Sequence, residues 1–253
     1  MADIRSVLIT GAARRIGRQL ALDLAADGYD VAVHCNTSRA EAEGVAADIR
    51  QLGRKAAVVQ GDLAEAGVEV RLMEEAIKAL GAISVLINNA SVFEPDDAGT
   101  MTTESWDRHQ NTNLRAPIML SQCFAKLLPA SLSGNIINIV DQRVWKLNPK
   151  FFSYTMSKTG LWTATRTLAQ ALAPRIRVNA IGPGPALPSA RMDQAEFDKQ
   201  ARLTLLGRGT SPAEISAAAK FILSQPALTG QMIALDGGQH LVWQTPDVVE
   251  VQE

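Results

Sequence analysis

The sequence contains few residues of the kinds that build disulfide frameworks or metal centres. There are two cysteines and three histidines in 253 residues. Cys35 and Cys123 lie in apolar stretches, and their spacing is not that of metal ligands. We therefore expect two reduced core thiols, no disulfide and no metal site.

The sequence also lacks a charge imbalance and a long apolar run. Its formal net charge of -1 gives no reason to expect a nucleic acid or an anionic membrane surface as partner. No apolar run is long enough to span a membrane. Residues 1–5 lead almost directly into an apolar run, so we expect no signal peptide and a cytoplasmic location. Without repeats or linkers, we expect one domain over residues 1–253.

Short apolar runs alternate with helical patterns along the chain. This alternation predicts a parallel sheet covered by helices on both faces, a doubly wound α/β Rossmann fold with seven strands. The segment 186–210 is weakly patterned and is predicted to be a mobile lid over the substrate. The predicted strands cover residues 6–10, 30–35, 55–60, 84–88, 135–140, 177–181 and 230–235.

The predicted helices follow these strands. A long helix at 103–129 carries Asn113 near its middle, where asparagine is a poor helix former. Asn113 is therefore a candidate for a kink or a polar site. Further helices are expected from about residue 16 to Gly28, at 38–52, after Leu63 to about 80, from Tyr154 to 172, and at 212–224.

The turn after the first strand fits a nucleotide phosphate. It reads Gly11-Ala12-Ala13-Arg14-Arg15-Ile16-Gly17 and leads directly into a helix. Gly11 allows a tight turn, Gly17 allows close backbone approach, and helix N-terminal amides bind anions. A purely structural strand-to-helix turn is the alternative.

The end of the second strand bears on the choice of cofactor. A free ribose 2′-hydroxyl usually meets a carboxylate there, but the chain has no acid before Glu41. Arginines and hydroxyls at this position instead suit a 2′-phosphate, hence NADP(H), although Arg39 can also be read as a solvated helix residue. The residues involved are Arg14, Arg15, His34, Asn36, Thr37, Ser38 and Arg39, with His34 expected mainly as a strand-end residue.

Tyr154 and Lys158 form the candidate catalytic pair. Their spacing places both side chains on one helix face. A nearby ammonium favours the phenolate, so we expect the pKa of Tyr154 to fall below its usual value of about 10. An ordinary helix surface is the alternative. However, the pair follows the fifth strand directly, at the sheet edge where Gly11, Asp62, Asn89, Asp141 and Pro183 also end strands.

Asp62 has two readings. It can accept a hydrogen bond from an adenine amino group, or it can cap the following helix. The sequence favours neither.

These motifs together resemble the short-chain dehydrogenase/reductase family along nearly the whole chain. The resemblance implies NAD(P)(H)-dependent hydride transfer, with Tyr154 as proton donor, Lys158 lowering its pKa and holding the nicotinamide ribose, and Asn113 positioning a water. It also extends the cofactor set to Leu63, Ala90, Ser91 and Gly184. The matching residues are Thr10-Gly11, Arg15, Gly17, Asp62, Asn88-Asn89-Ala90, Asn113, Tyr154, Lys158, Asn179 and Pro183-Gly184.

Three departures from the general family pattern resemble the pteridine reductase branch, including the dihydromonapterin reductases. Arg15 replaces a glycine, Asn-Asn-Ala continues as Ser91-Val92-Phe93, and Asp141 stands where a serine is usual. By this resemblance Phe93 stacks on a pterin, Arg15 reaches phosphates and substrate, and Ser91 lines the site. Phe93 closing the core is the alternative.

Asp141 can also be judged from its chemistry. A serine hydroxyl can donate to a carbonyl oxygen as it becomes an alkoxide, whereas an ionised aspartate repels that charge. A pterin instead offers N–H donors to a carboxylate. Asp141 can also bond the Tyr154 hydroxyl and help to pass it a proton. A site that has lost catalysis is the alternative.

The sequence thus predicts an NADPH-dependent reductase of a pterin-like small molecule, with no metal and no nucleic-acid or membrane partner. Its apolar helix faces near 103–129 and 153–172, with family analogy, predict a homotetramer. A reductase of ketones, quinones or 3-oxoacyl substrates and a catalytically silent NADPH sensor are the alternatives.

Overall fold

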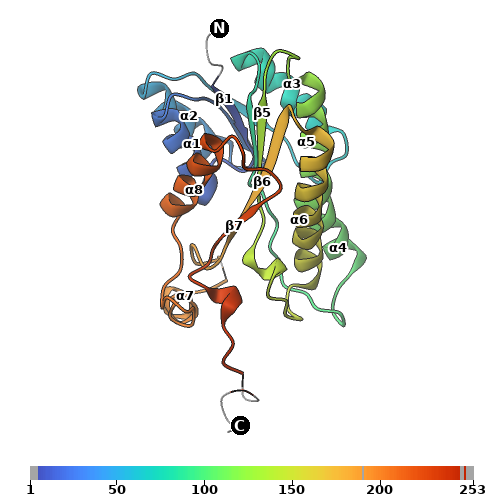
Figure 1. Ribbon diagram of the computed structural model, residues 1–253, viewed down its shortest axis with the longest axis vertical. Helices are drawn as coiled ribbons and strands as arrows, with labels where there is room; N and C mark the ends of the chain where they lie inside the picture. Colours follow the sequence, from blue (N-terminus) through green and yellow to red (C-terminus); the bar gives the residue numbers. More distant parts are fainter. Residues whose placement is uncertain (1–4, 190, 246–247, 249–253) are drawn as a thin grey trace.

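The computed structural model describes residues 5–189, 191–245 and 248 of the chain and contains one seven-stranded parallel sheet (Figure 1). The strand order is β3-β2-β1-β4-β5-β6-β7. This confirms the predicted doubly wound α/β fold. The strands are β1 (Ser6–Ile9), β2 (Asp30–Cys35), β3 (Ala56–Gln60), β4 (Val85–Asn88), β5 (Gly134–Ile139), β6 (Ile176–Pro183) and β7 (Met232–Leu235).

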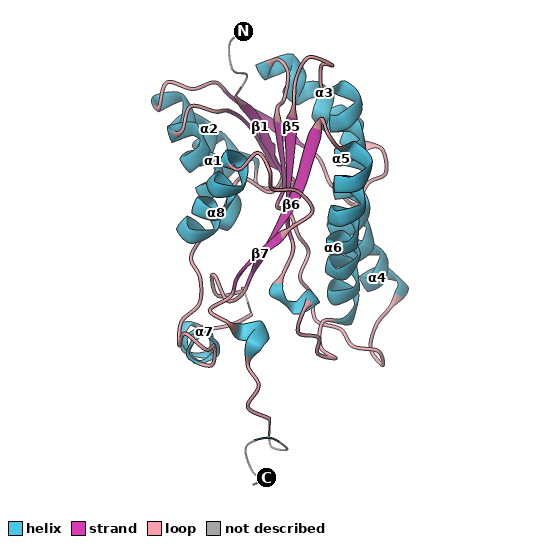
Figure 2. Cartoon of the chain, viewed as in Figure 1, coloured by secondary structure: helices cyan, strands magenta, loops and turns pink. Residues whose placement is uncertain are grey.

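Helices cover both faces of the sheet (Figure 2). On one face lie α1 (Arg15–Ala26), α2 (Arg39–Gln51) and α8 (Pro212–Ser224), and on the other lie α3 (Val68–Leu80), α5 (Ala116–Leu127) and α6 (Phe152–Leu172). Side chains alternate between two apolar cores because successive strand residues point to opposite faces. In β1, Val7 and Ile9 belong to the α1/α2/α8 core, and Leu8 belongs to the α3/α5/α6 core.

The strand order changes direction at the β1–β4 pair, which places a crevice at the carboxyl ends of these strands. The register aligns Ile9 with Val33 on one side and with Ile87 on the other. The turns that follow β1, β2 and β4 therefore open at the same edge of the sheet. The predicted cofactor residues at 11–17, 34–39 and 89–91 lie at these strand ends. Of the others, Asp62 and Leu63 follow β3, Pro183 and Gly184 lie at the end of β6, and Tyr154 and Lys158 lie on α6.

The long helix predicted at 103–129 is interrupted. α4 (Thr103–Gln110) and α5 are joined by a π-helical turn at Asn111–Arg115, and Asn113 within it is fully buried. Single π-turns inside helices often occur at functional sites. The predicted irregularity at Asn113 is therefore confirmed.

The segment 186–210 is more regular than predicted, because it contains a helix, α7 (Gln194–Arg202). Asp193 caps this helix by accepting a hydrogen bond from the Glu196 backbone N–H at 2.8 Å. Asp193-Gln-Ala-Glu196 is a capping-box-like signal that the sequence analysis did not use. A second difference lies before α3, which begins at Val68 after a turn rather than directly after Leu63.

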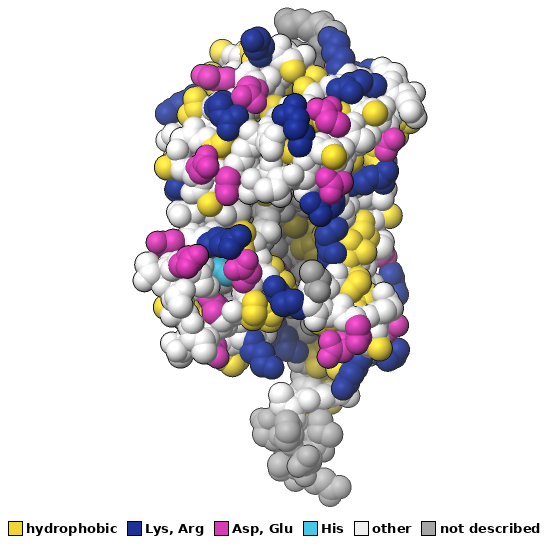
Figure 3. Space-filling view, turned by 180° about the vertical axis from the view of Figure 1, so that it is seen from behind, with side chains coloured by type: hydrophobic (Ala, Val, Ile, Leu, Met, Phe, Trp, Pro, Cys, Tyr) yellow, Lys and Arg dark blue, Asp and Glu magenta, His cyan; other side chains and the backbone are white. Residues whose placement is uncertain are grey.

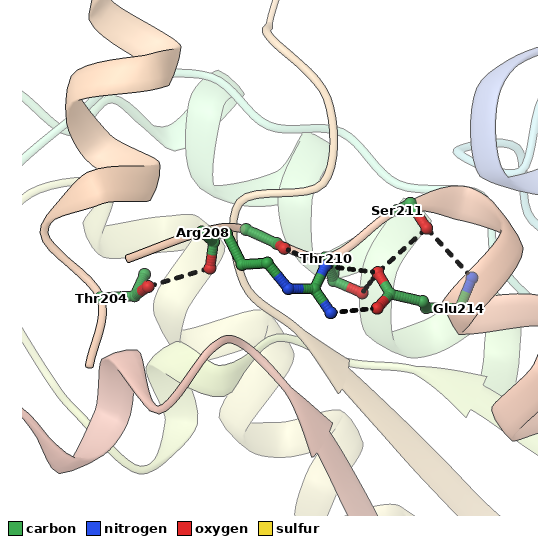
Figure 4. A network of polar contacts seen from close by, with 6 residues as sticks. Thr204, Arg208, Thr210, Ser211 and Glu214 are labelled. Atoms are coloured by element: carbon green, nitrogen blue, oxygen red, sulfur yellow. Dashed lines mark hydrogen bonds and ion pairs between the residues drawn. The ribbon is translucent and has the colours of Figure 1, made fainter. Parts of the chain in front are cut away.

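A polar network fixes the carboxyl-terminal end of this segment to α8 (Figure 4). Arg208 forms an ion pair with Glu214, whose carboxylate also accepts from the Ser211 hydroxyl at 3.0 Å. Where the two ends of the segment meet, the Thr210 backbone N–H donates to the Pro185 carbonyl at 2.9 Å. The segment 186–209 therefore leaves and rejoins the fold at one point.

Among the described residues, no helix is long and apolar enough to cross a membrane. Cys35 and Cys123 are free thiols, and burial raises the pKa of each. In the same part of the chain, no three His, Cys, Asp or Glu side chains gather in an arrangement that could hold a metal ion.

Candidate active site

A cleft of about 900 Å³ opens at the carboxyl ends of the strands. It collects nearly every site residue predicted from the sequence, although these residues come from distant parts of the chain. Asn113 and Arg39 do not line it. The predicted residues that do are Gly11, Arg14, Arg15, Ile16, Gly17, His34, Asn36, Thr37, Ser38, Asp62, Leu63, Asn89, Ala90, Ser91, Phe93, Asp141, Tyr154, Lys158, Pro183 and Gly184.

The turn after β1 forms a cradle that only glycine permits. A Cβ atom at Gly17 would lie 2.2 Å from the Gly11 carbonyl oxygen, and Gly11 itself has φ +64°. Asn89 holds the turn by donating to the Thr10 and Gly11 carbonyls at 2.8 and 3.2 Å. Helix α1 starts here with no side-chain cap and no acidic residue in its first turn. Its first amides are therefore suited to the phosphates of a dinucleotide.

His34 supports this cradle from β2. Its Nδ1 accepts from the Gly11 backbone N–H at 3.0 Å, so its Nε2–H donates to the Gly61 carbonyl, also at 3.0 Å. Burial lowers the pKa of His34 to about 4. Both ring nitrogens are occupied, so the predicted strand-end role fits better than direct cofactor binding.

Acid should therefore weaken the fold through His34. The folded-state pKa lies below the unfolded value of about 6.5, so the unfolded chain binds more protons between pH 6.5 and pH 4. This stabilising contribution is present above pH 6.5 and is lost as the pH falls toward 4, by at most about 3 kcal/mol.

The measurement is urea unfolding of the wild type and His34→Gln at several pH values from 7.5 to 4. Glutamine does not titrate, so the unfolding free energy of the variant should fall less steeply with acid. If the unfolding free energies of the two proteins fall in parallel as the pH is lowered, His34 is not the source of the loss of stability in acid.

The predicted 2′-phosphate residues are only partly brought together. Arg14 contacts the Ser38 hydroxyl and lies 3.4 Å from Glu41. Arg39 does not line the cleft, contrary to the prediction, because its position in the first turn of α2 directs it to Gln60 and Glu43. The 2′-phosphate side of the cleft thus depends on Arg14, with Thr37 and Ser38 beside it.

Asp62 does not cap helix α3, whose N-cap is Gly67. One oxygen of Asp62 accepts from the Ala64 backbone N–H at 2.8 Å, and the residue lines the cleft. Among the described residues its second oxygen has no hydrogen-bond partner. The predicted bond to an adenine amino group therefore stays a proposal.

Tyr154 and Asp141 are hydrogen-bonded to each other in the half of the cleft that lies away from the nucleotide-binding turn. The Tyr154 hydroxyl donates to Asp141 Oδ2 at 2.8 Å, and Asp141 Oδ1 accepts from the Arg143 backbone N–H at 2.7 Å. Lys158, which is 1% exposed, donates from Nζ to the Ile139 carbonyl at 2.8 Å. Helix α6 thus holds Tyr154 and Lys158 beside the end of β5.

The predicted fall in the pKa of Tyr154 is wrong for this arrangement. Burial raises its pKa well above the usual value, and the charge and hydrogen bond of Asp141 raise it further. The Lys158 ammonium lies 5.8 Å from the Tyr154 ring and is bonded to a carbonyl. Burial also raises the pKa of Asp141 and lowers that of Lys158 to about 8. When Asp141 is ionised, removing the Tyr154 proton would leave two anions in contact, and this repulsion helps to keep the pKa of Tyr154 high.

The Asn113 side chain holds the loop after β4. Its side-chain oxygen accepts from the Val92 N–H at 2.8 Å and from the Ser91 hydroxyl at 3.3 Å. Its amide donates to the Val92 carbonyl and to the Ser157 hydroxyl at 2.9 and 3.1 Å. All four hydrogen-bonding positions of the side chain are therefore used. The water-positioning role implied by the family would therefore fall to the Asn113 backbone and stays a prediction.

Phe93 projects from that loop into the cleft. It is stacked on Phe151, with ring centroids 4.2 Å apart and planes at 9°, and its ring meets Tyr154 edge-on at 4.7 Å. One face of Phe93 is thus occupied by protein. Stacking on a substrate ring therefore requires its other face, or displacement of Phe151.

Asp96 is a positioning residue that the sequence analysis missed. Its carboxylate accepts from the Ser153 backbone N–H at 3.0 Å and from the Ser105 hydroxyl at 2.6 Å. It therefore supplies an N-terminal cap for α6, whose own N-cap residue, Phe151, has φ +58° and no capping side chain. Because Asp96 and Ser153 are far apart in the chain, no local pattern could have revealed this cap.

Comparison with known proteins agrees with this geometry. The sequence model of the short chain dehydrogenase family matches residues 5–200. The chain belongs to the short-chain dehydrogenase/reductase family of oxidoreductases. The matched segment includes the glycine turn, Asn113 and the Tyr154–Lys158 pair.

Relatives of two kinds are similar over nearly the whole chain. The crystal structure of FolM alternative dihydrofolate reductase 1 from Brucella suis in complex with NADP is 49% identical, with a TM-score of 0.95, over 98% of this chain and 100% of that one. The Brucella canis counterpart, also with NADP, is 48% identical, with a TM-score of 0.92, over 97% and 98%. The 3-oxoacyl-[acyl-carrier-protein] reductase FabG of Staphylococcus epidermidis is 32% identical over 94% of this chain and 99% of that protein.

These similarities support the resemblance to the pteridine reductase branch and agree with the predicted cofactor. The glycine cradle, the uncapped α1 amides and Arg14 fit a phosphorylated dinucleotide. Of the predicted cofactor contacts, those at Arg39 and His34 are the ones that the geometry does not support.

Proposed function

We propose that this chain is an NADPH-dependent reductase of a dihydropterin-type heterocycle. The observation that carries the proposal is the hydrogen bond between Tyr154 and Asp141 at 2.8 Å, beside Phe93 and Lys158. A carboxylate at this place suits a substrate that presents N–H donors. The relatives crystallised with NADP, which are 49% and 48% identical, support the cofactor and the substrate class.

The chain's own residues then carry out the proton chemistry. NADPH, when bound, supplies the hydride that reduces a ring C=N carbon. Tyr154 protonates the neighbouring nitrogen, and Asp141 relays a proton from solvent in the cleft to the Tyr154 oxygen, so one hydride and one solvent-derived proton are added in total. Lys158 stays fixed on the Ile139 carbonyl beneath this pair. Phe93 provides an apolar wall for the flat ring.

A second candidate is reduction of a 3-oxoacyl group or another ketone. It is favoured by the FabG relatives and by the burial of Asp141, which raises the pKa of this carboxyl. A protonated Asp141 can donate a hydrogen bond to a developing alkoxide, which an ionised one cannot. In that case activity should fall as rising pH ionises Asp141.

Asp141→Ser separates the two candidates. If the substrate is a pterin, kcat/KM for dihydropterins should fall about 10- to 100-fold, because the proton return to Tyr154 is lost. If it is a ketone, serine restores a hydroxyl donor and kcat/KM for ketones should rise. NADPH oxidation at 340 nm (the standard assay wavelength) is followed with dihydrobiopterin, dihydromonapterin and a ketone panel.

Asp27→Ser, an exposed change at the carboxyl end of α1 and away from the cleft, is the matched control. Ketone turnover without pterin turnover would reject the pterin proposal. NADPH binding with no turnover on any substrate would favour a silent sensor.

Two further parts of the proposal concern assembly and location. We place the protein in the cytoplasm as a homotetramer formed through the α4, α5 and α6 faces. Met119 and Leu127 on α5 are exposed apolar side chains consistent with such a contact. Light scattering after gel filtration would show a mass of one chain instead of four if the assembly proposal is wrong.

A further inference from the structure

Cationic side chains border the cleft, which is visible as a hollow across the middle of the face shown in Figure 3. Arg115 is not among the described residues that line it. It is the last residue of the π-helical turn Asn111–Arg115, and its side chain reaches the loop that follows β3. That loop lines the cleft with Asp62, Leu63 and Ala64. Arg115 can therefore act on a ligand only through this loop.

The Arg115 guanidinium binds three consecutive carbonyl oxygens of the loop. Its Nη2 lies 3.0, 3.1 and 2.9 Å from the carbonyl oxygens of Leu63, Ala64 and Glu65, to which it donates. A guanidinium carries only donors, and its planar shape suits several acceptors at once. Three successive peptide groups are therefore held by one side chain that comes from a distant part of the sequence.

The same peptide groups orient Asp62. The Ala64 N–H donates to Asp62 Oδ1 at 2.8 Å, and the Glu65 N–H donates to the Asp62 carbonyl at 3.0 Å. Each of these N–H groups shares a rigid peptide plane with a carbonyl that Arg115 binds. Each plane is thus bonded to Arg115 through its oxygen and to Asp62 through its nitrogen. Arg115 therefore sets the orientation of Asp62 without touching it.

Glu69 keeps the guanidinium in place. Its carboxylate lies 3.6 Å from Arg115 Nη2, and the residue is only 2% exposed. Among the described residues, Glu69 Oε1 has no hydrogen-bond partner, so the guanidinium offsets the charge of this buried acid. Helix α3 begins at Val68, and the N-terminus of a helix also favours an acid. Arg115 is therefore fixed between α3 and the loop.

The π-helical turn thus holds two walls of the cleft. Asn113 binds Ser91 and Val92 in the loop after β4, whereas Arg115 binds the loop after β3. A helical turn of this kind often occurs at a functional site. Here it fixes loops at two different strand ends from a single point.

We propose that Arg115, held by Glu69, is a positioning residue for the adenine half of NADPH. It orders the loop after β3 in advance, so Asp62 meets the cofactor with little further loss of loop freedom, and such preorganisation raises affinity. The proposal uses the predicted contact between Asp62 and the adenine amino group. It concerns the cofactor alone and is independent of whether a pterin or a ketone is reduced.

The test compares the double variant Arg115→Met/Glu69→Gln with Glu69→Gln alone. The double variant removes the bonds to the carbonyls without leaving a buried carboxylate unpaired, so the fold should survive. Calorimetric titration should give a Kd for NADPH about 10-fold higher in the double variant and within about threefold of the wild type in Glu69→Gln. The Kd for 2′,5′-ADP, which contains only the adenine half, should rise by the same factor as that for NADPH.

Two further measurements separate positioning from a simple loss of stability. At saturating NADPH, kcat of the double variant should stay that of the wild type, because Asp141, Tyr154 and Lys158 are unchanged. Without NADPH, hydrogen exchange at the Ala64 and Glu65 amides should be faster in the double variant. Arg115→Lys keeps the charge without the planar fork and should lose less affinity for NADPH than the double variant.

Arg175→Met is the matched control, because Arg175 also binds backbone carbonyls but does not line the cleft. Its guanidinium donates to the Ala125 and Leu128 carbonyls at 2.7 and 2.9 Å. This variant should unfold at a lower temperature than the wild type and bind NADPH with the same affinity.

The proposal is overturned if the Kd for NADPH in the double variant is within about twofold of the wild type. An equal rise in Arg175→Met would trace the effect to lost stability and also overturn it. Unchanged binding of 2′,5′-ADP would place the effect outside the adenine half. If Glu69→Gln alone weakens binding as much as the double variant, the carbonyl bonds of Arg115 are not the cause. If the expected binding results are obtained but no pterin is reduced, the proposed function falls and this assignment stands.

Discussion

Tyr154→Phe is expected to lower kcat for the physiological substrate by about 10³-fold while leaving NADPH affinity nearly unchanged. The hydroxyl is the only part of the side chain that is removed, and phenylalanine can keep the ring contacts with Phe93 and His109. The fold should therefore survive. Stopped-flow measurement of hydride transfer and fluorescence titration of NADPH test the two halves of this expectation.

The same variant has a consequence for Asp141. The Tyr154 hydroxyl donates to this buried carboxyl and helps to keep its pKa down. Without that donor, the pKa of Asp141 should rise further. Tyr29→Phe, at the only other tyrosine in the chain, is the control and should be fully active. Turnover by Tyr154→Phe within tenfold of the wild type would mean that another group donates the proton.

Gly17→Ala is expected to weaken NADPH binding by at least about 100-fold, which corresponds to about 2.7 kcal/mol. A methyl group at this position would lie 2.2 Å from the Gly11 carbonyl oxygen and 2.7 Å from Asn89 Nδ2. The Gly11 oxygen belongs to the backbone, so the cradle must open to admit the methyl group. Calorimetric titration of NADPH gives the dissociation constant.

Gly44→Ala is the matched control for this change. Gly44 lies within α2, and a Cβ atom there would meet no atom within 4 Å. Alanine favours a helix interior by roughly 1 kcal/mol over glycine, so this variant should bind NADPH normally and unfold at a slightly higher temperature. A Gly17→Ala protein with wild-type affinity would show that the cradle does not hold the phosphates.

The sheet could be predicted from the sequence because its strands are buried on both faces. The run Asp30–Cys35, for example, is buried from Val31 to Cys35 and includes the β-branched Val31 and Val33, and β2 has the predicted bounds. The α1 turn and the Tyr154–Lys158 pair could be predicted for a different reason. In each, the residues that matter are only a few positions apart in the sequence, so their spatial arrangement follows from the local structure.

The remainder of the site depends on contacts that a sequence does not encode locally. Burial and the bond from Asp141 set the pKa of Tyr154, and these outweigh the effect expected from Lys158. All hydrogen-bonding positions of the Asn113 side chain are occupied by Ser91, Val92 and Ser157, which come from other parts of the fold. Arg39 pairs with Glu43 four residues along α2 and does not line the cleft, so its predicted contact with the 2′-phosphate stays a prediction.

The hydrogen bond between Thr210 and Pro185 closes the two ends of a surface segment that can tolerate substitutions which the nucleotide-binding turn cannot. The two ends of segment 186–209 are joined by this backbone hydrogen bond, and the Leu206 N–H also donates to the Gly237 carbonyl at 2.9 Å. A change in the length of this surface segment should therefore cost less stability than a change within a strand. The cradle between Gly11 and Gly17 has no such freedom. Because Leu187, Arg191 and Met192 of this segment line the cleft, we expect substitutions in it to change substrate preference more than NADPH binding.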